Sequence, residues 1–158
     1  MTRRQKGGYF QPGEGAPVPI EICIEKRVQF SDADIMGVVW HGNYAKYFEE
    51  ASGELGRKCG LSYKEFRDAR IQAPIVQFHV DYHRPLMLAE RIKIKAAYVW
   101  SEGARLQTEF TVLKEDGTVA ATGYTVQMFI DAMSGDVLLT IPDLLERCRR
   151  RWMSGDLL

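Results

Sequence analysis

The chain has 158 residues, of which 46% are hydrophobic and 27% are charged, which is the composition of one globular domain with a sizeable core. Its 21 Lys and Arg residues balance its 21 Asp and Glu residues, so the formal net charge is zero. A general nucleic-acid binder needs a surplus of cations, and a disordered chain has fewer apolar residues, so both classes are excluded. No run of about 18 or more apolar residues is present, and the sequence therefore predicts no membrane span.

The cysteines and the N-terminus indicate the compartment. Cys23, Cys59 and Cys148 lie far apart in the sequence and form no Cys-x-x-Cys pair, which argues against a zinc knuckle or a local redox motif. An odd number of cysteines is typical of a reducing compartment. The basic N-terminus is not followed by an apolar run, so it does not resemble a secretory signal. We expect a cytoplasmic protein.

The first ordered element begins near residue 20. Residues 1–19 hold four Gly and three Pro without apolar periodicity, which predicts a disordered leader followed by a single domain over 20–158. From Ile20 to Phe30 apolar residues alternate with charged ones, the pattern of a half-buried strand.

A long helix follows. From Asn43 the apolar period changes to three and four, and one stripe is formed by Tyr44, Tyr47, Phe48, Ala51 and Leu55. Gly60 is placed to end this helix in a left-handed conformation. The sequence Ser62-x-x-Glu65 resembles a capping box, which predicts a second, shorter helix to about Arg70.

The rest of the chain reads as strands and one final helix. After Pro74, alternation predicts strands over 75–83, 91–98, 106–112 and 119–130, with turns at 115–118 and 134–136. Pro142 stands at a first helical position and predicts a C-terminal helix. Strands and helices do not alternate as in a parallel sheet, so the fold class is α+β: an antiparallel sheet of about five strands with the long helix across one face.

The segment between the first strand and the long helix contains the residue types of an active site, two carboxylates and an imidazole. The first turn of a helix has unpaired N–H groups and a partial positive charge, and His41 stands at this helix start. Asp34 lies a few residues earlier, on a loop that Gly37 allows to fold back. A carboxylate and helix N–H donors would then converge on one point, an arrangement that suits attack on a carbonyl.

Residues 30–51, FSDADIMGVVWHGNYAKYFEEA, resemble the signature of the 4-hydroxybenzoyl-CoA thioesterase family, which includes the Tol–Pal associated acyl-CoA thioesterases of the hot-dog superfamily. The resemblance extends over roughly residues 20–150. It implies a curved antiparallel sheet wrapped around one long helix, and a homodimer or homotetramer with its active site at a subunit interface. It further implies hydrolysis of an acyl-CoA thioester to the free acid and CoA, with no cofactor and no metal.

The resemblance also assigns site residues. The family's catalytic Asp matches Asp34, and the backbone N–H that polarises the thioester carbonyl matches His41, whose side chain is a second candidate. The expected substrate-binding residues are Gly37, Val39, Trp40, Asn43 and Tyr44. The aromatic residues of this region suit aryl and fatty acyl groups equally. The chain departs from the Tol–Pal type at 49–52, where Glu-Glu-Ala-Ser replaces Glu-Arg-Ala-Arg, so contacts with CoA or the acyl group there are in doubt.

Several alternatives remain open at this point. Asp34 could merely cap its own turn, and Asp32 reads as a turn or helper residue. The helix residues Glu49 and Glu50 are the second choice for the catalytic carboxylate. A non-catalytic acyl-binding or scaffold protein on the same fold is the alternative function.

Two further patterns have an ordinary and a functional interpretation. His79, Asp81 and His83 share one strand face, which would suit a metal, although a solvated or interface face is the simpler interpretation. The basic run at 147–151 could bind CoA phosphates or complement the helix dipole.

Overall fold

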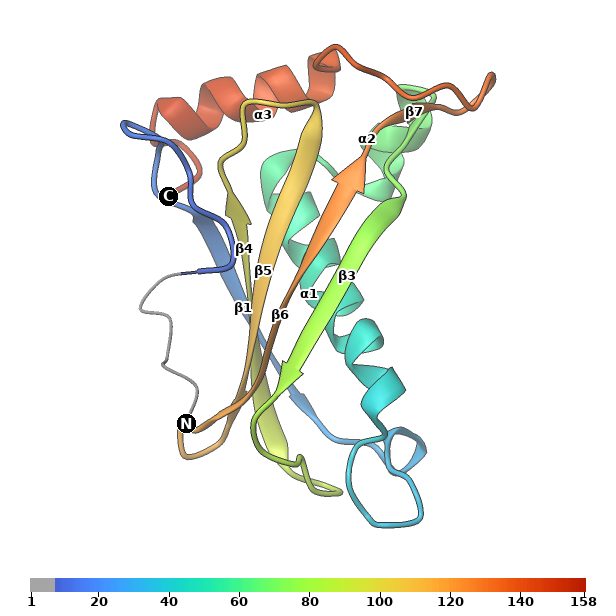
Figure 1. The fold of residues 1–158 in the computed structure, drawn as a ribbon, viewed down its shortest axis with the longest axis vertical. Helices are drawn as coiled ribbons and strands as arrows, with labels where there is room; N and C mark the ends of the chain where they lie inside the picture. Colours follow the sequence, from blue (N-terminus) through green and yellow to red (C-terminus); the bar gives the residue numbers. More distant parts are fainter. Residues whose placement is uncertain (1–7) are drawn as a thin grey trace.

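The computed structural model describes residues 8–158, and it has the expected α+β architecture. Its main sheet is antiparallel in the order β1-β4-β5-β6-β3, formed by Ile20–Arg27, Arg91–Val99, Arg105–Lys114, Val119–Met128 and Ile75–Tyr82. The helices are α1 (Tyr44–Cys59), α2 (Tyr63–Asp68) and α3 (Asp143–Met153). Figure 1 shows the sheet curving around α1, with α3 across one end of the molecule and the loop before α1 at the other.

Two strand predictions need correction. The first strand ends at Arg27 rather than at Phe30, because Phe30–Asp32 forms a 3-10 turn and leaves Phe30 85% exposed. The strand predicted over 119–130 is interrupted at Phe129, which is buried, and continues as β7 (Ile130–Asp131). β7 pairs with β2 (Ile71–Gln72), a short strand that the sequence pattern did not predict.

α1 follows the prediction closely because its local signals agree. The whole apolar stripe is buried, and Phe48 stacks on Phe110 of β5 with ring centroids 4.2 Å apart. Gly60 ends the helix at φ 71°, as expected of a left-handed C-cap. Gly123 of β6 lies under Phe48: an added Cβ there would be 2.7 Å from the Phe48 ring and would collide with the His79 carbonyl.

α3 closes one end of the core. Its apolar face is buried, as predicted, and Arg149 also turns inward, where it donates hydrogen bonds to the carbonyls of Ser101 and Gly103, each at 2.5 Å. Arg149 is therefore committed to the fold rather than to CoA phosphates. The neighbouring Cys148 thiol, together with burial, holds the pKa of Cys59 above its usual range, so two cysteines distant in sequence meet between α1 and α3.

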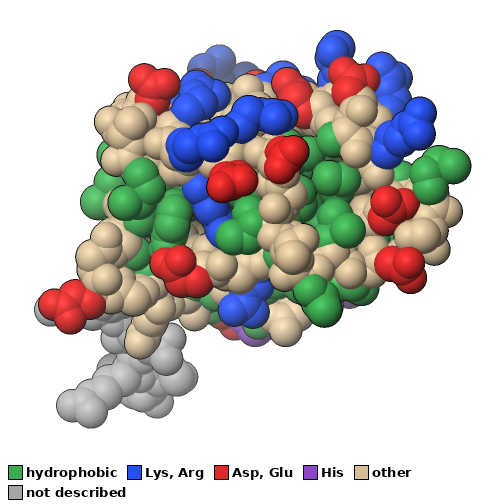
Figure 2. All heavy atoms as spheres, turned by 90° about the horizontal axis from the view of Figure 1, so that it is seen from above, with side chains coloured by type: hydrophobic (Ala, Val, Ile, Leu, Met, Phe, Trp, Pro, Cys, Tyr) green, Lys and Arg blue, Asp and Glu red, His purple; other side chains and the backbone are tan. Residues whose placement is uncertain are grey.

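The end face that α3 covers is strongly charged. Figure 2 shows Lys and Arg side chains gathered on it, with carboxylates among them. None of the helices within residues 8–158 is both long and apolar enough to cross a membrane.

The described part of the expected leader makes specific contacts. Residues 1–7 lie outside the described residues, and 8–19 contain no helix or strand. Tyr9 packs beside Tyr124 on the outer face of the sheet and donates a hydrogen bond to Asp81 at 2.6 Å. The Trp152 indole donates to the Val18 carbonyl at 2.7 Å. Aromatic side chains therefore give this Gly- and Pro-rich segment anchoring points that composition alone did not suggest.

Candidate active site

Asp32 anchors the 28–43 loop. Its side chain is 8% exposed and accepts hydrogen bonds from the Tyr47 hydroxyl and the Gln29 N–H, both at 2.9 Å. Its carbonyl accepts from the Trp40 N–H at 2.9 Å and from the Asn43 side chain at 2.7 Å. Burial and the bond to Asp32 raise the pKa of Tyr47, which therefore stays a neutral donor. Asp32 thus joins both ends of the loop to α1.

Asp34 lies on a tight turn inside this loop. Gly37 adopts φ 76° and donates its N–H to the Asp34 carbonyl at 3.0 Å, while the Asp34 N–H bonds to the Val38 carbonyl at 2.9 Å. One carboxylate oxygen, Oδ1, accepts from the Met36 N–H at 2.8 Å. The other oxygen takes no hydrogen bond from residues 8–158. The side chain therefore caps its own turn and keeps one oxygen free.

The loop leads into a 3-10 turn, His41–Asn43, that continues directly as α1. The first N–H groups of a helix have no partner within it, and those of His41 and Gly42 donate to no backbone carbonyl in the described chain. The His41 carbonyl accepts a hydrogen bond at 2.8 Å from the hydroxyl of Tyr82, at the end of β3. This helix start is held in place from the edge strand while its N–H groups stay available to an anion.

The expected substrate-binding residues divide into two groups. Val39, Asn43 and Tyr44 are buried, and burial raises the pKa of Tyr44 to about 12. They position the loop from within the fold. Gly37 and Trp40 lie nearer the surface, where the Trp40 ring contacts the imidazole of His41 with centroids 5.0 Å apart. No hydrogen bond joins the side chains of Asp34 and His41, both of which lie in the described chain.

A cleft at the other end of α1 was not predicted. Its volume is about 840 Å³, and its walls come from α1, α2, the 70–74 segment, β4, β5 and β6. Apolar and aromatic residues form much of it, including Tyr98, Leu106, Leu61 and Phe66. Sequence patterns could not reveal it because its walls lie far apart in the chain. Of the two alternative carboxylates, Glu49 lies at this cleft, whereas Glu50 pairs with Lys26 at 2.6 Å.

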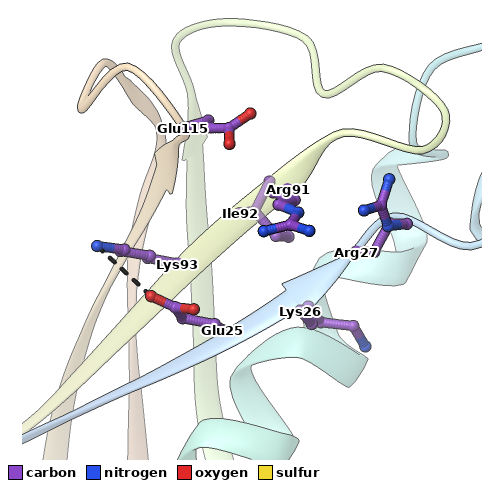
Figure 3. A pocket seen from close by; sticks show the side chains of 7 residues that line it. All are labelled: Glu25, Lys26, Arg27, Arg91, Ile92, Lys93 and Glu115. Atoms are coloured by element: carbon purple, nitrogen blue, oxygen red, sulfur yellow. Dashed lines mark ion pairs between the residues drawn. The ribbon is translucent and has the colours of Figure 1, made fainter.

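A smaller groove of about 470 Å³ lies at the ends of β1 and β4. Its lining is mostly charged, with Lys93 paired to Glu25 at 3.5 Å (Figure 3). None of the expected site residues lines it.

The possible metal ligands lie on the outer face of the sheet. His79 Nε2 is 3.0 Å from Asp81 Oδ2, and His83 Nε2 is 2.9 Å from the Thr122 hydroxyl. The hydrogen bond from Tyr9, and then that from His79, hold the pKa of Asp81 below its usual range. Within residues 8–158, no group of three or more His, Cys, Asp or Glu side chains is placed to hold a metal ion.

The sequence matches the family model of the thioesterase-like superfamily over residues 28–148. The chain belongs to this superfamily. It is 30% identical over 96 residues to the 1,4-dihydroxy-2-naphthoyl-CoA hydrolase of Rippkaea orientalis, an alignment that covers 60% of this chain and 67% of the relative. It is 22% identical over 107 residues to the acyl-CoA thioester hydrolase YbgC of Escherichia coli O6:H1, covering 68% and 80%.

Solved structures give the same assignment. The DHNA-CoA thioesterase of Staphylococcus aureus superimposes with a TM-score of 0.76 at 25% identity, over 86% of this chain and 93% of that one. The fold is therefore the hot-dog fold, which confirms the architecture expected from the resemblance.

Proposed function

We propose that this thioester hydrolase cleaves an acyl- or aryl-CoA thioester to the free acid and CoA, and that it is of the 4-hydroxybenzoyl-CoA thioesterase type associated with Tol–Pal. Membership of the superfamily and the names of the relatives support the reaction class. The observations that carry the proposal are an Asp34 carboxylate oxygen that accepts no hydrogen bond from the described residues and N–H groups at the following helix start that donate to no backbone carbonyl there.

The chemistry follows from these two groups. An ionised Asp34 either attacks the thioester carbon, expelling CoA thiolate and leaving an anhydride for water to open, or takes a proton from a water that attacks directly. Both routes place negative charge on the thioester oxygen. The His41 N–H and the positive end of α1 stabilise that charge.

A second copy of the chain completes the site. β3 is an edge strand with exposed apolar side chains at Ile75, Val76, Phe78 and Tyr82, a surface suited to pairing with another β3. Antiparallel pairing about a two-fold axis places the end of one β3 beside the beginning of the other. Tyr82 at the end contacts His41, and Pro74 just before the beginning lines the cleft. The helix start of one subunit would then face the cleft of its partner.

The test is the charge of Asp34. Asp34→Asn keeps the shape of the loop but removes the nucleophile or base, so thiol release from a panel of short, long and aryl-CoA thioesters should fall by roughly 100-fold or more. Circular dichroism should show an unchanged fold. His41→Ala should reduce thiol release less than Asp34→Asn does, because the backbone N–H of residue 41 remains.

Glu49→Gln and Glu50→Gln are the matched controls on the helix. Full activity of Asp34→Asn together with an inactive helix variant would assign the carboxylate to α1. The absence of thiol release from every thioester by the parent would favour a non-catalytic acyl-binding protein.

A further inference from the structure

The inner face of the sheet beside the cleft carries hydroxyl groups without hydrogen-bond partners. Thr108 of β5 is 0% exposed, and its Oγ1 has no partner in the described structure. Tyr98 of β4 lies directly opposite Thr108 in the strand register, lines the cleft and is only 4% exposed. Its hydroxyl forms no hydrogen bond with residues 8–158.

A fully buried hydroxyl without a partner, as at Thr108, is unusual in a folded protein. Burying a hydroxyl without a partner destabilises the folded state, and most buried polar atoms are therefore paired. Burial raises the pKa of Tyr98, so its phenol remains a neutral hydrogen-bond donor across the physiological range. A ligand that brings an oxygen to this wall would satisfy a group that the protein leaves unpaired.

The surroundings define what else the ligand must be. Leu61, Phe66, Ile71 and Leu106 make the cleft a favourable place for an apolar body. Gln127 adds a polar point: its Nε2 donates to the Ala73 carbonyl at 2.7 Å, while its Oε1 takes no hydrogen bond from the described residues. The cleft therefore combines apolar walls with a few polar groups.

We propose that the cleft holds the acyl part of the thioester and that Tyr98 selects an acyl group carrying its own oxygen, a hydroxyl or a carbonyl, over the same group without it. This rests on the proposed function. The Tyr98 hydroxyl, which belongs to a residue that lines the cleft, donates to that oxygen. An unsubstituted alkyl or phenyl group would contact the apolar walls and leave the Tyr98 hydroxyl unpaired, which lowers its transition-state binding.

Pairs of thioesters that differ by one oxygen test this directly. The kcat/KM ratio is measured for 4-hydroxybenzoyl-CoA over benzoyl-CoA and for 3-hydroxyoctanoyl-CoA over octanoyl-CoA. We expect the parent to prefer the oxygenated member of at least one pair. Tyr98→Phe should reduce that ratio by roughly tenfold, the scale of one hydrogen bond. Thr108→Val, at a buried position that does not line the cleft, and Thr111→Val, on the outer face of the same strand, should both leave the ratio unchanged.

A binding measurement separates this inference from the proposed function. Calorimetry compares the free acids 4-hydroxybenzoate and benzoate on the parent, Tyr98→Phe and Thr108→Val proteins. A preference for the hydroxylated acid that Tyr98→Phe abolishes would support the inference even if no thioester were cleaved. The inference is overturned if the parent shows no preference in either assay, or if Tyr98→Phe keeps the parent's preference. Should Tyr98→Phe fail to fold, Tyr98→Met takes its place, and a preference kept by that variant overturns the inference.

Discussion

Asp32 and Asp34 stand two residues apart and do different work, a distinction that depends on burial. The buried Asp32 carboxylate is engaged by Tyr47 and Gln29, whereas Asp34 keeps one oxygen free. Residue type alone cannot separate the two roles. The nearby Gly37 was the local signal that favoured Asp34 as the catalytic carboxylate. The 3-10 turn at 30–32 places the first carboxylate inward.

Replacing Asp32 should therefore affect folding first. Asp32→Ala leaves the Tyr47 hydroxyl and the Gln29 N–H without their partner, which should lower the free energy of unfolding by about 1–3 kcal/mol. Urea denaturation followed by circular dichroism measures this change. Asp34→Ala is the control, and a larger loss of stability there would contradict the division of roles.

Thr108 should behave in the opposite way. Thr108→Val removes a buried hydroxyl that has no partner and keeps the branched shape of the side chain. Thermal unfolding without ligand should show a free energy of unfolding unchanged or raised by up to about 2 kcal/mol. A marked loss of stability would show that the hydroxyl already has a partner in the folded protein.

At the scale of elements, the segment 8–19 and helix α3 are held to the sheet by side chains that the sequence patterns did not predict to make tertiary contacts. Tyr9 and Arg149 both appeared in stretches whose composition suggested solvent, one rich in Gly and the other in Arg. Each makes long-range hydrogen bonds to the sheet or its loops, which no local period records.

The N-terminal contacts should contribute measurable stability. Tyr9→Ala/Phe10→Ala removes the packing on Tyr124 and the bond to Asp81, and should lower the free energy of unfolding by about 1–2 kcal/mol. For a chain of this length that corresponds to a fall in Tm of about 2–8 °C. Gln11→Ala, at an exposed neighbouring position, is the control in the same thermal scan.

The hydrogen bond between Tyr9 and Asp81 should stabilise the fold only within a defined pH range. Burial, and then the bond to Asp81, raise the pKa of Tyr9 to about 12, while the pKa of Asp81 is lowered from 3.8. The carboxylate's contribution is present above its unfolded pKa and is lost as pH falls through the lowered value. The phenol's contribution is present below its unfolded pKa of 10.0 and is lost as pH rises through about 12.

The parent should therefore exceed Tyr9→Phe in stability by a constant margin between roughly pH 4 and pH 10. The margin should shrink on both sides of that window in urea titrations. A margin that stays constant well below pH 4 would contradict the assigned bond.

Arg149 should be the most sensitive residue of α3. Arg149→Ala leaves the carbonyls of Ser101 and Gly103 unpaired at the turn between β4 and β5, and should cost about 2–4 kcal/mol of stability. Arg150→Ala, one residue further on and exposed, should cost little. An equal loss of stability in the two variants would contradict the structural role of Arg149.

At the scale of the whole molecule, more of the fold than of the candidate site could be predicted from the sequence. α1 could be placed to within a residue because its stripe and its capping Gly60 agree, and strand alternation gave the five strands. The β2–β7 pair and the cleft could not be predicted, since each forms between segments distant in the chain. The meeting of Cys59 with Cys148 was hidden for the same reason.

The assembly can be measured directly. We expect a homodimer or homotetramer by light scattering at micromolar concentration. Val76→Asp places a charge on the β3 edge, where Val76 is 53% exposed, and should give a monomer of low activity. Val137→Asp, at a residue that is 51% exposed but away from that edge, should keep the parent's mass. A monomeric parent would rule out a site shared between subunits.

Gly123 of β6 is a point at which α1 packs closely on the sheet, through Phe48. Phe48 packs on the sheet at this glycine, one turn after the start of α1 and directly before Glu49, the first α1 residue that lines the cleft. A side chain at position 123 would collide with Phe48 and push this part of α1 away from the sheet. Because the same helix supplies the N–H groups at its start and a wall of the cleft, a side chain at position 123 would disturb the candidate site and the cleft together.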